Sequence, residues 1–343
     1  MALVVAADFF HDRPVLVTGA TGFIGCRLVT ALQERAARVR VLVRSIASAP
    51  SDWELVEIVA GDLADSASLT RACAGIDTVI HAAGFAHADV GNTPEFAARH
   101  WAINADGTFR LLDAAVVAGV KRFIFLSSVK AVGEPESPWV DERWVDERWN
   151  APPETTYGQA KRAAEERVLA VGRATGMHVV NLRPALVYGP GMKGNLPRLI
   201  DAVRRGWLPP LPETGNRRSL VHVDDVAQAV LLAAALPAVT GQTWFVTDGQ
   251  AYSGRELYRL IRRMLDLPQP RWILPAPVFY GMARLADGLL GLAGRRNRPV
   301  WTVLNQVLGG AGYDSSRIQR ELGYRPEWTL ARYSETERAK RKS

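Results

Sequence analysis

Cysteine is scarce in this sequence. Cys26 and Cys73 are the only two in 343 residues, they form no Cys-x-x-Cys pair, and the six histidines show no ligand spacing. A disulfide-stabilised scaffold needs several thiols, and a structural zinc site needs closely spaced Cys and His ligands. The composition therefore excludes a disulfide scaffold and a structural zinc, and we expect no metal site.

Long uninterrupted hydrophobic runs are also missing. The most apolar late stretch, residues 272–292, is broken by two prolines, an arginine and an aspartate. These interruptions argue against a membrane span and favour a packed or groove-lining helix. The first 14 residues lack a basic start and carry Asp8 and Asp12, which is unlike a signal peptide. We expect a cytoplasmic protein with no membrane span.

Dense charge of one sign is confined to the tail, residues 338–342. The net charge of +7 and the pI near 9.6 suit an anionic ligand such as a nucleotide diphosphate. The remaining basic residues are spread along the chain, and a short basic tail is usually a solvated segment. We therefore expect no nucleic-acid partner.

The first half of the chain alternates two kinds of segment. Short β-branched runs are followed by stretches with helical periodicity such as 23–35, 94–118 and 155–175. Alternating strands and helices predict parallel strands joined by right-handed crossovers, hence a doubly wound α/β Rossmann sheet. The expected strands are 15–17, 39–43, 56–60, 78–81, 123–126 and 179–182.

Proline and glycine become frequent between residues 184 and 215, and the alternation becomes less regular. We predict a NAD(P)-binding domain over 13–183, to which later segments return, and a smaller, mainly substrate-binding lobe over 184–335. Residues 336–343 form a basic tail. A tandem Trp-Val-Asp-Glu-Arg at 139–143 and 144–148 is interpreted as a local duplication in a surface loop, because two copies do not make a repeat architecture.

A glycine-rich turn follows the first predicted strand. Gly19, Gly22 and Gly25 lie between that strand and a helix. A phosphate must approach the free N–H groups of a helix N-terminus closely, so Gly19 and Gly22 keep the turn open and Gly25 lets the helix lie against the strand. The sequence therefore predicts a dinucleotide site that also includes Thr21, Phe23 and Ile24.

The choice between NAD and NADP depends on the end of the second strand. NAD sites usually place an acid there for the ribose hydroxyls. This chain has Arg44 instead, and an arginine can pair with a 2′-phosphate. Arg44 favours NADP over NAD, although a solvated arginine after a strand is also common.

Tyr157 and Lys161 lie four residues apart at the start of a predicted helix, and therefore on one face of it. A nearby ammonium and the positive oxidised cofactor favour the phenolate, so we expect the pKa of Tyr157 to be lowered and Tyr157 to act as acid or base. Lys161 would also hold the cofactor ribose. The serine pair after the fifth strand offers a hydroxyl to orient the substrate oxygen; Ser128 is the candidate and Ser127 the alternative, and turn capping is the structural interpretation.

These motifs, in this order, resemble the extended short-chain dehydrogenases/reductases. The Gly-x-x-Gly-x-x-Gly spacing matches their cofactor loop, and the segments Gly-Asp-Leu at 61–63, His-Ala-Ala-Gly at 81–84 and Asn-Ala-Asp-Gly-Thr at 104–108 match their later cofactor motifs. The resemblance implies a Rossmann fold, an NAD or NADP cofactor and a further set of cofactor contacts. Those contacts are Asp62, Leu63, Ala82, Ala83, Gly84, Asn104 and Pro184.

Within that superfamily the chain is similar to the nucleotide-sugar epimerase/dehydratase group. The segments at 126–134, 183–196 and 216–224 carry the resemblance, which spans roughly residues 14 to 330 and looks most like UDP-hexose 4-epimerases and UDP-4-keto-6-deoxy-N-acetylhexosamine reductases. An Arg-x-x-Asp signature of UDP-galactose epimerases is not evident, and the arginines at 295–298 are the candidate substitute for it. The resemblance implies a substrate site formed by His87, Ser128, Asn181, Asn195, Leu196 and Arg218.

Three functions remain open at this stage. The first is an epimerase or reductase acting at C4 of a UDP-sugar. The second is an NADP-dependent ketone reductase of the dihydroflavonol or 3β-hydroxysteroid type, whose pocket the apolar stretch 272–292 could line. The third is a non-catalytic NADP-binding regulator, which the intact Ser128, Tyr157 and Lys161 disfavour. The resemblance also implies a homodimer paired through the helices at 94–118 and 155–175.

Overall fold

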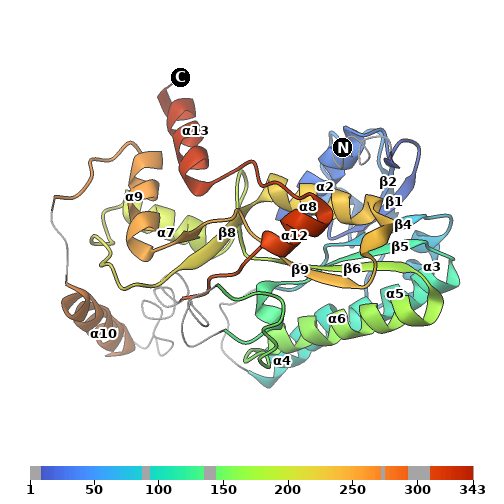
Figure 1. The fold of residues 1–343 in the computed structure, drawn as a ribbon, viewed down its shortest axis with the longest axis horizontal. Coiled ribbons are helices and arrows are strands. Elements are labelled where there is room, and N and C mark those ends of the chain that lie inside the picture. The colour runs from blue at the N-terminus through green and yellow to red at the C-terminus, as the bar shows by residue number, and fades with distance from the viewer. Residues whose placement is uncertain (1–8, 87–92, 135–143, 272–274, 293–309, 343) are drawn as a thin grey trace.

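The computed structural model describes residues 9–86, 93–134, 144–271, 275–292 and 310–342 (Figure 1). His87, the first Trp-Val-Asp-Glu-Arg copy at 139–143 and the arginines at 295–298 lie outside the described residues. The predictions that rest on them therefore stay predictions.

The central element is a seven-stranded sheet with the order β3-β2-β1-β4-β5-β6-β9. All of its strand pairs are parallel. This confirms the predicted doubly wound Rossmann sheet, whose order reverses beside β1. The strands are β1 (Pro14–Thr18), β2 (Arg38–Val43), β3 (Glu57–Ala60), β4 (Thr78–His81), β5 (Arg122–Leu126), β6 (His178–Pro184) and β9 (Gln242–Val246).

Helices cover both faces of this sheet (Figure 1). On one face α2 (Phe23–Gln33) packs beside α8 (Val223–Ala235), and on the other α3 (Ser66–Cys73), α5 (Gly107–Val117) and α6 (Thr156–Thr175) lie side by side. Buried apolar residues fill both layers. Short 3₁₀ turns occur at η1 (Ile46–Ser48), η3 (Val129–Ala131) and η4 (Pro237–Val239).

The helix expected at 94–118 is interrupted. It consists of α4 (Pro94–Trp101), a π-helical turn η2 (Ala102–Asp106) and α5. Asn104 lies in this turn, 1 % exposed. π turns inside helices often occur at functional sites, and this one carries a residue of the predicted cofactor site.

The C-terminal half contributes a smaller sheet with the order β10-β8-β7, formed by β7 (Leu186–Tyr188), β8 (Arg218–His222) and β10 (Ala251–Tyr252). It packs with α7 (Asn195–Arg204), α9 (Gly254–Met264), α10 (Ala276–Leu292) and α13 (Leu330–Lys342) around its own apolar cluster. The segments α8, β9 and α12 (Ser316–Leu322) return to the large sheet. The boundary at residue 184 stays a prediction.

The second Trp-Val-Asp-Glu-Arg copy corrects the surface-loop interpretation. Val145 is 1 % exposed and pairs with Tyr313 in a short β-bridge. The Glu147 carboxylate accepts a hydrogen bond of 3.1 Å from the backbone N–H of Phe245 in β9. This copy therefore protects the sheet edge formed by β9, because edge strands need such cover.

Within the described ranges, no helix is both long and apolar enough to span a bilayer. The same part of the chain brings together no group of three or more His, Cys, Asp or Glu side chains that could hold a metal ion.

Candidate active site

The glycine turn connects β1 to the N-terminus of α2. Gly19 has a φ of +70°, and a Cβ there would lie 2.5 Å from the backbone nitrogen of Ala83. A Cβ on Gly25 would lie 2.1 Å from the carbonyl oxygen of Gly19. Both positions therefore require glycine because other backbone segments pack directly against them.

Gly22 differs from its two neighbours in the motif. It is the N-cap of α2, and a Cβ there would meet only the Gly19 oxygen at 3.0 Å. The first turn of α2 carries no acidic residue. Its free N–H groups and positive dipole end therefore suit a phosphate, so this turn fits a dinucleotide. Thr21 is exposed, and Phe23 and Ile24 are partly buried beside it.

Two of the other predicted cofactor positions lie at the carboxyl ends of neighbouring strands. Arg44 is exposed directly after β2, where the protein would contact an adenosine ribose. Asp62 follows β3, is exposed, and accepts a 2.8 Å hydrogen bond from the backbone N–H of Ala64. Leu63 is partly buried beside it. The predicted contact of Asp62 with adenine stays a prediction.

Buried hydrogen bonds hold the end of β4 between β1 and α5. The ring of His81 lies 2.6 Å from the Thr18 hydroxyl and 2.9 Å from the Thr108 hydroxyl. Burial, aided by the charge of Lys161, lowers the pKa of His81 to about 3, so the ring is neutral at physiological pH. The loop of Ala82, Ala83 and Gly84 is thereby fixed next to the glycine turn.

Asn104 links that loop to the catalytic helix. Its amide accepts a 2.9 Å hydrogen bond from the Phe85 N–H and donates one of 2.9 Å to the Phe85 carbonyl. A Cβ on Gly84 would lie 3.1 Å from the Asn104 amide oxygen and 3.3 Å from the Lys161 ammonium nitrogen. Gly84 is therefore the point at which the cofactor loop and Lys161 meet.

Ser128 and Tyr157 are hydrogen-bonded through their side chains. Ser128 also accepts a 3.2 Å hydrogen bond from the Lys130 N–H and caps η3, so the capping interpretation holds for it and its catalytic role stays a prediction. Ser127 is 5 % exposed, and its buried hydroxyl has no partner among the described residues. The geometry therefore favours Ser128 over Ser127.

The pKa of Tyr157 in the protein alone is raised, whereas a lowered pKa is expected for the complete site. Burial raises the pKa of this phenol, and the hydrogen bond from Ser128 only partly opposes that effect. In the protein alone the Lys161 ammonium donates to the Leu126 carbonyl at 2.8 Å. The lowering expected in the site with oxidised cofactor stays a prediction. Burial also lowers the pKa of Lys161 to about 8, against the charge of Glu165, so Lys161 remains largely cationic near neutral pH.

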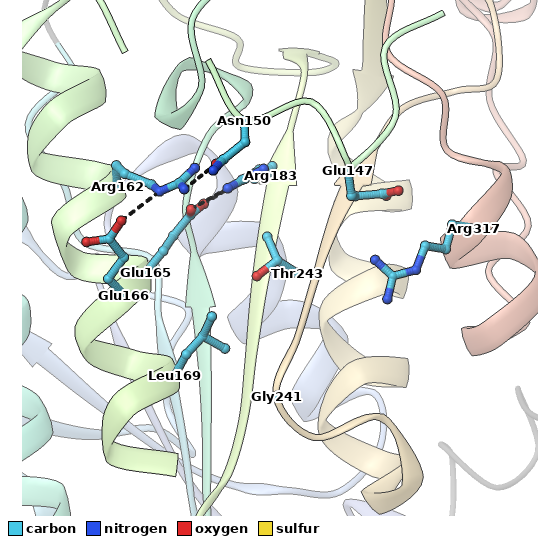
Figure 2. A pocket seen from close by; sticks show the side chains of 10 residues that line it. All are labelled: Glu147, Asn150, Arg162, Glu165, Glu166, Leu169, Arg183, Gly241, Thr243 and Arg317. Atoms are coloured by element: carbon cyan, nitrogen blue, oxygen red, sulfur yellow. Dashed lines mark hydrogen bonds and ion pairs between the residues drawn. The ribbon is translucent and has the colours of Figure 1, made fainter. Parts of the chain in front are cut away.

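A buried ion pair missed by the sequence analysis lies behind Lys161. The Glu165 carboxylate accepts hydrogen bonds of 2.8 and 2.6 Å from the Arg183 guanidinium, and both side chains are almost fully buried. Figure 2 shows the pair at the edge of a polar cavity of about 280 Å³ between α6, β9 and α12. Glu165 follows Lys161 by four residues, and that spacing was the available signal.

The smaller lobe places Arg218 at the start of β8, 9 % exposed. Burial lowers the pKa of Arg218, whereas the nearby Glu134 raises it. The neighbouring Arg217 instead pairs with Glu213 at 3.4 Å in a partly exposed position. This contrast supports the choice of Arg218 as the functional arginine of the two.

The other predicted substrate residues are placed differently. Asn195 begins α7 and is partly exposed, whereas Leu196 is 3 % exposed within the lobe core and offers only its backbone. Asn181 is fully buried on β6, where its amide donates to the Glu165 carbonyl at 3.3 Å and to the Thr243 hydroxyl at 3.2 Å. Asn181 therefore lies within the sheet, and its substrate contact stays a prediction. Pro184 ends β6 and is buried.

The parallel sheet has its switch point beside a glycine turn, and a Ser–Tyr–Lys group follows the fifth strand. Together these features define the class of Rossmann-fold nicotinamide oxidoreductases. Residues 15–246 match the NAD dependent epimerase/dehydratase family. The chain belongs to this family, and it is an enzyme that uses a nicotinamide cofactor.

Relatives with different chemistry are similar over nearly the whole chain. The UDP-glucose 4-epimerase of Vibrio cholerae is 31% identical over 93% of this chain and 92% of its own length. A 3 beta-hydroxysteroid dehydrogenase/Delta 5-->4-isomerase of Mycobacterium tuberculosis is 32% identical over 92% of this chain and 86% of its own length. The solved structure of MoeE5 in complex with UDP-glucose and NAD has a TM-score of 0.70 and 26% identity, over 96% of this chain and 98% of that one.

Proposed function

We propose that this enzyme acts at C4 of a UDP-sugar, as a 4-epimerase or a 4-keto reductase, with Tyr157 as the acid/base. The observation that carries the proposal is the convergence of Ser128, Tyr157 and Lys161 beside the cofactor turn. The similarity to the Vibrio UDP-glucose 4-epimerase and to a protein solved with UDP-glucose and NAD supports this substrate class.

In this proposal each residue has a distinct task. A bound nicotinamide dinucleotide supplies hydride transfer to or from the sugar carbon. Tyr157 takes the hydroxyl proton during oxidation or returns it during reduction, and Ser128 holds the same oxygen by a hydrogen bond. Lys161 holds the cofactor ribose and favours the phenolate electrostatically. Because burial raises the pKa of Tyr157 in the protein alone, positive charge in the complete site is needed to ionise it at neutral pH.

The substrate-binding part of the proposal rests on the smaller lobe. The buried guanidinium of Arg218 suits a diphosphate because its planar fork makes paired, charge-assisted hydrogen bonds to phosphate oxygens. Asn195 at the N-terminus of α7 would present amide groups to the nucleotide. His87 stays a proposed sugar contact outside the described residues.

The exposed position of Arg44 after β2 supports NADP over NAD. A reductase must exchange its cofactor in each cycle, whereas an epimerase regenerates its own. An NADP preference would therefore favour a 4-keto reductase over a 4-epimerase.

A second candidate function is an NADP-dependent ketone reductase for an apolar substrate of the 3β-hydroxysteroid type. The similarity to the mycobacterial 3 beta-hydroxysteroid dehydrogenase favours it. An apolar groove beside α10, lined by Trp207 and Met282 among others, also fits such a ligand.

A panel of substrates separates the two functions. The purified enzyme would be given either cofactor with UDP-glucose, UDP-galactose, their N-acetyl forms, UDP-4-keto-6-deoxy-N-acetylhexosamine or a 3β-hydroxysteroid. We expect turnover with a UDP-sugar and none with the steroid. Turnover of the steroid alone would overturn the nucleotide-sugar proposal while leaving the Tyr157 chemistry intact.

We further propose a homodimer paired through α4, α5 and α6. Trp101 and Val117 are apolar residues on these helices that are 41% and 82% exposed. Sedimentation velocity at micromolar concentration should show a dimer, and a monomer throughout the range would contradict this pairing.

A further inference from the structure

Helix α10 has an apolar face on each side. Phe279 and Ala283 are 3% and 5% exposed and pack into the core of the smaller lobe. The opposite stripe remains in solvent: Val278 is 50%, Met282 49%, Leu285 66% and Leu289 61% exposed. These residues follow one another at helical spacing, where a helix on the surface of a protein normally carries polar side chains.

The stripe continues into a groove of about 530 Å³ in which Met282 lies together with Trp207. Trp207 is 73% exposed in the loop after α7. We call Trp207, Val278, Met282, Leu285 and Leu289 the apolar patch. It lies at the outer end of the smaller lobe, where α10 projects furthest from the large sheet (Figure 1).

Arginines border the apolar patch. The Arg205 guanidinium lies 4.9 Å from the Trp207 ring centre, Arg262 lines the groove, and Arg284 is exposed on α10 itself. The one acidic residue of α10, Asp287, is 7% exposed and therefore contributes little to the surface. Arg204 and Arg205 share the carboxylate of Asp201, at 3.4 and 2.8 Å. Residues 254–292 contain six arginines against three acidic residues, so the surroundings of the patch still carry a net positive charge.

We propose that the apolar patch and its arginines form a docking surface for a membrane leaflet that contains anionic phospholipid. A helix with Val, Met and Leu on one side, beside an exposed Trp and arginines, inserts its apolar side chains among the acyl chains while the guanidinium groups meet the phosphates. A membrane fits better than a second copy of the chain. A second copy would bring like-charged arginines face to face, whereas an anionic leaflet would meet them with phosphate groups.

The surface is small, so binding should be reversible and weakened by salt. The experiment is co-sedimentation of the full chain with vesicles of phosphatidylcholine alone or with 30 mol% phosphatidylglycerol. We expect binding to the anionic vesicles that is roughly fivefold stronger than to neutral ones, and that is lost at about 0.5 M salt.

A matched pair of variants tests the location. Leu285→Glu/Leu289→Glu should reduce anionic-vesicle binding by roughly fivefold or more, because it places carboxylates in the inserted face. The control is Leu55→Glu, a leucine 87% exposed in the loop between η1 and β3, which should bind as the wild type does. Circular dichroism and thermal melts confirm that each variant folds.

Equal binding to neutral and anionic vesicles would overturn the proposal, and so would a double variant that binds like the wild type. A third contradictory result is a concentration-dependent dimer that the double variant dissociates, without vesicle binding by either protein. That result would assign the patch to a second copy. Vesicle binding requires neither cofactor nor substrate, so its failure is distinct from failure of the proposed function.

Discussion

At the scale of single residues, the central feature is a phenol whose surroundings oppose its proposed task. Burial raises the pKa of Tyr157, and the hydrogen bond from Ser128 offsets only part of that effect. Ionisation near neutral pH then requires cationic neighbours in the complete site, which include Lys161. Tyr157 therefore depends on neighbouring positive charge to ionise, and removal of its hydroxyl should strongly reduce kcat.

We expect Tyr157→Phe to reduce kcat by roughly 10²- to 10⁴-fold, the usual contribution of a positioned acid or base. The dissociation constant of the cofactor should change by no more than about threefold, because the phenol acts on the proton of the substrate. Steady-state kinetics and a fluorescence titration with the reduced cofactor measure the two effects. A loss of kcat below tenfold would contradict the role of Tyr157.

Arg44 provides a second residue-scale prediction. Arg44→Ser should weaken NADPH binding by roughly 10- to 100-fold, since a hydrogen bond to a charged group contributes about 1.5–3 kcal/mol. NADH binding should stay within about twofold. Arg38→Ser, at the other end of β2, is the matched control. If Arg44→Ser weakens both cofactors equally, Arg44 does not read the 2′-phosphate.

At the scale of elements, helix α6 combines chemistry and structure. Tyr157, Lys161 and Glu165 recur every four residues, and Glu165 is held by Arg183 on β6. The carboxylate raises the pKa of Lys161, which burial lowers to about 8. Glu165 is therefore a positioning residue that helps to keep the ammonium charged.

Removal of this carboxylate should move the alkaline limb of the pH–rate profile. A lysine whose pKa is about 8 loses its charge as the pH rises through that value, so reduction should slow above it. Without the negative charge of Glu165 the pKa of Lys161 falls further, and the limb should move down by roughly one pH unit. Profiles of kcat/KM between pH 6 and 10 measure the shift.

Glu165→Gln leaves Arg183 charged and buried, which costs about 3–5 kcal/mol and could prevent folding. The double variant Glu165→Leu/Arg183→Met removes both charges and should recover most of that stability. The alkaline limb of its pH–rate profile should nevertheless remain at the lower pH. If the double variant is stable and its profile matches the wild type, Glu165 has a purely structural role.

Local sequence motifs predict some of these features, and contacts between distant segments determine the others. The glycine turn, the strand order around it and the Ser128–Tyr157 contact follow from local motifs, because a βαβ unit fixes their relative positions. The Glu165–Arg183 pair, the π turn at Asn104 and the use of the second Trp-Val-Asp-Glu-Arg copy depend on contacts between distant segments. The burial of Asn181 was not predicted for the same reason, because a polar residue within a strand shows no sequence signal of its burial.

At the scale of the whole molecule, buried acids join the smaller lobe to the large sheet. The Asp248 carboxylate, after β9, accepts hydrogen bonds from the hydroxyls of Tyr252 at 2.8 Å and Tyr188 at 3.3 Å. Burial raises the pKa of Asp248 to about 7. Asp225 on α8 accepts from the backbone of the segment before α13, and burial raises its pKa to about 6.

This arrangement predicts that stability falls as the pH rises. An acid whose pKa is raised by folding binds its proton more tightly in the folded state, so ionisation between about pH 4 and 7 opposes folding. Asp248→Asn keeps an acceptor for both tyrosines and removes that charge. It should increase the free energy of unfolding at pH 8 by roughly 1–3 kcal/mol, and by less at pH 5.

Urea unfolding at the two pH values measures this difference. The control is Asp52→Asn, an exposed acid in the loop before β3, which should show no such pH dependence. A stabilisation by Asp248→Asn that is equal at pH 5 and pH 8 would contradict the account, because the benefit must come from the charge.

Isotope transfer between substrate and cofactor tests the central claim most directly. The enzyme would be incubated at stoichiometric concentration with a UDP-hexose deuterated at C4, together with the oxidised cofactor, and the nicotinamide recovered after denaturation would be analysed by mass spectrometry. From the wild type we predict deuterium in the reduced nicotinamide, or inversion at C4 with the deuterium returned to the sugar, and from Tyr157→Phe neither. Deuterium that remains wholly on the sugar with every UDP-hexose, without any inversion at C4 although the cofactor is bound, would contradict C4 chemistry on a nucleotide sugar.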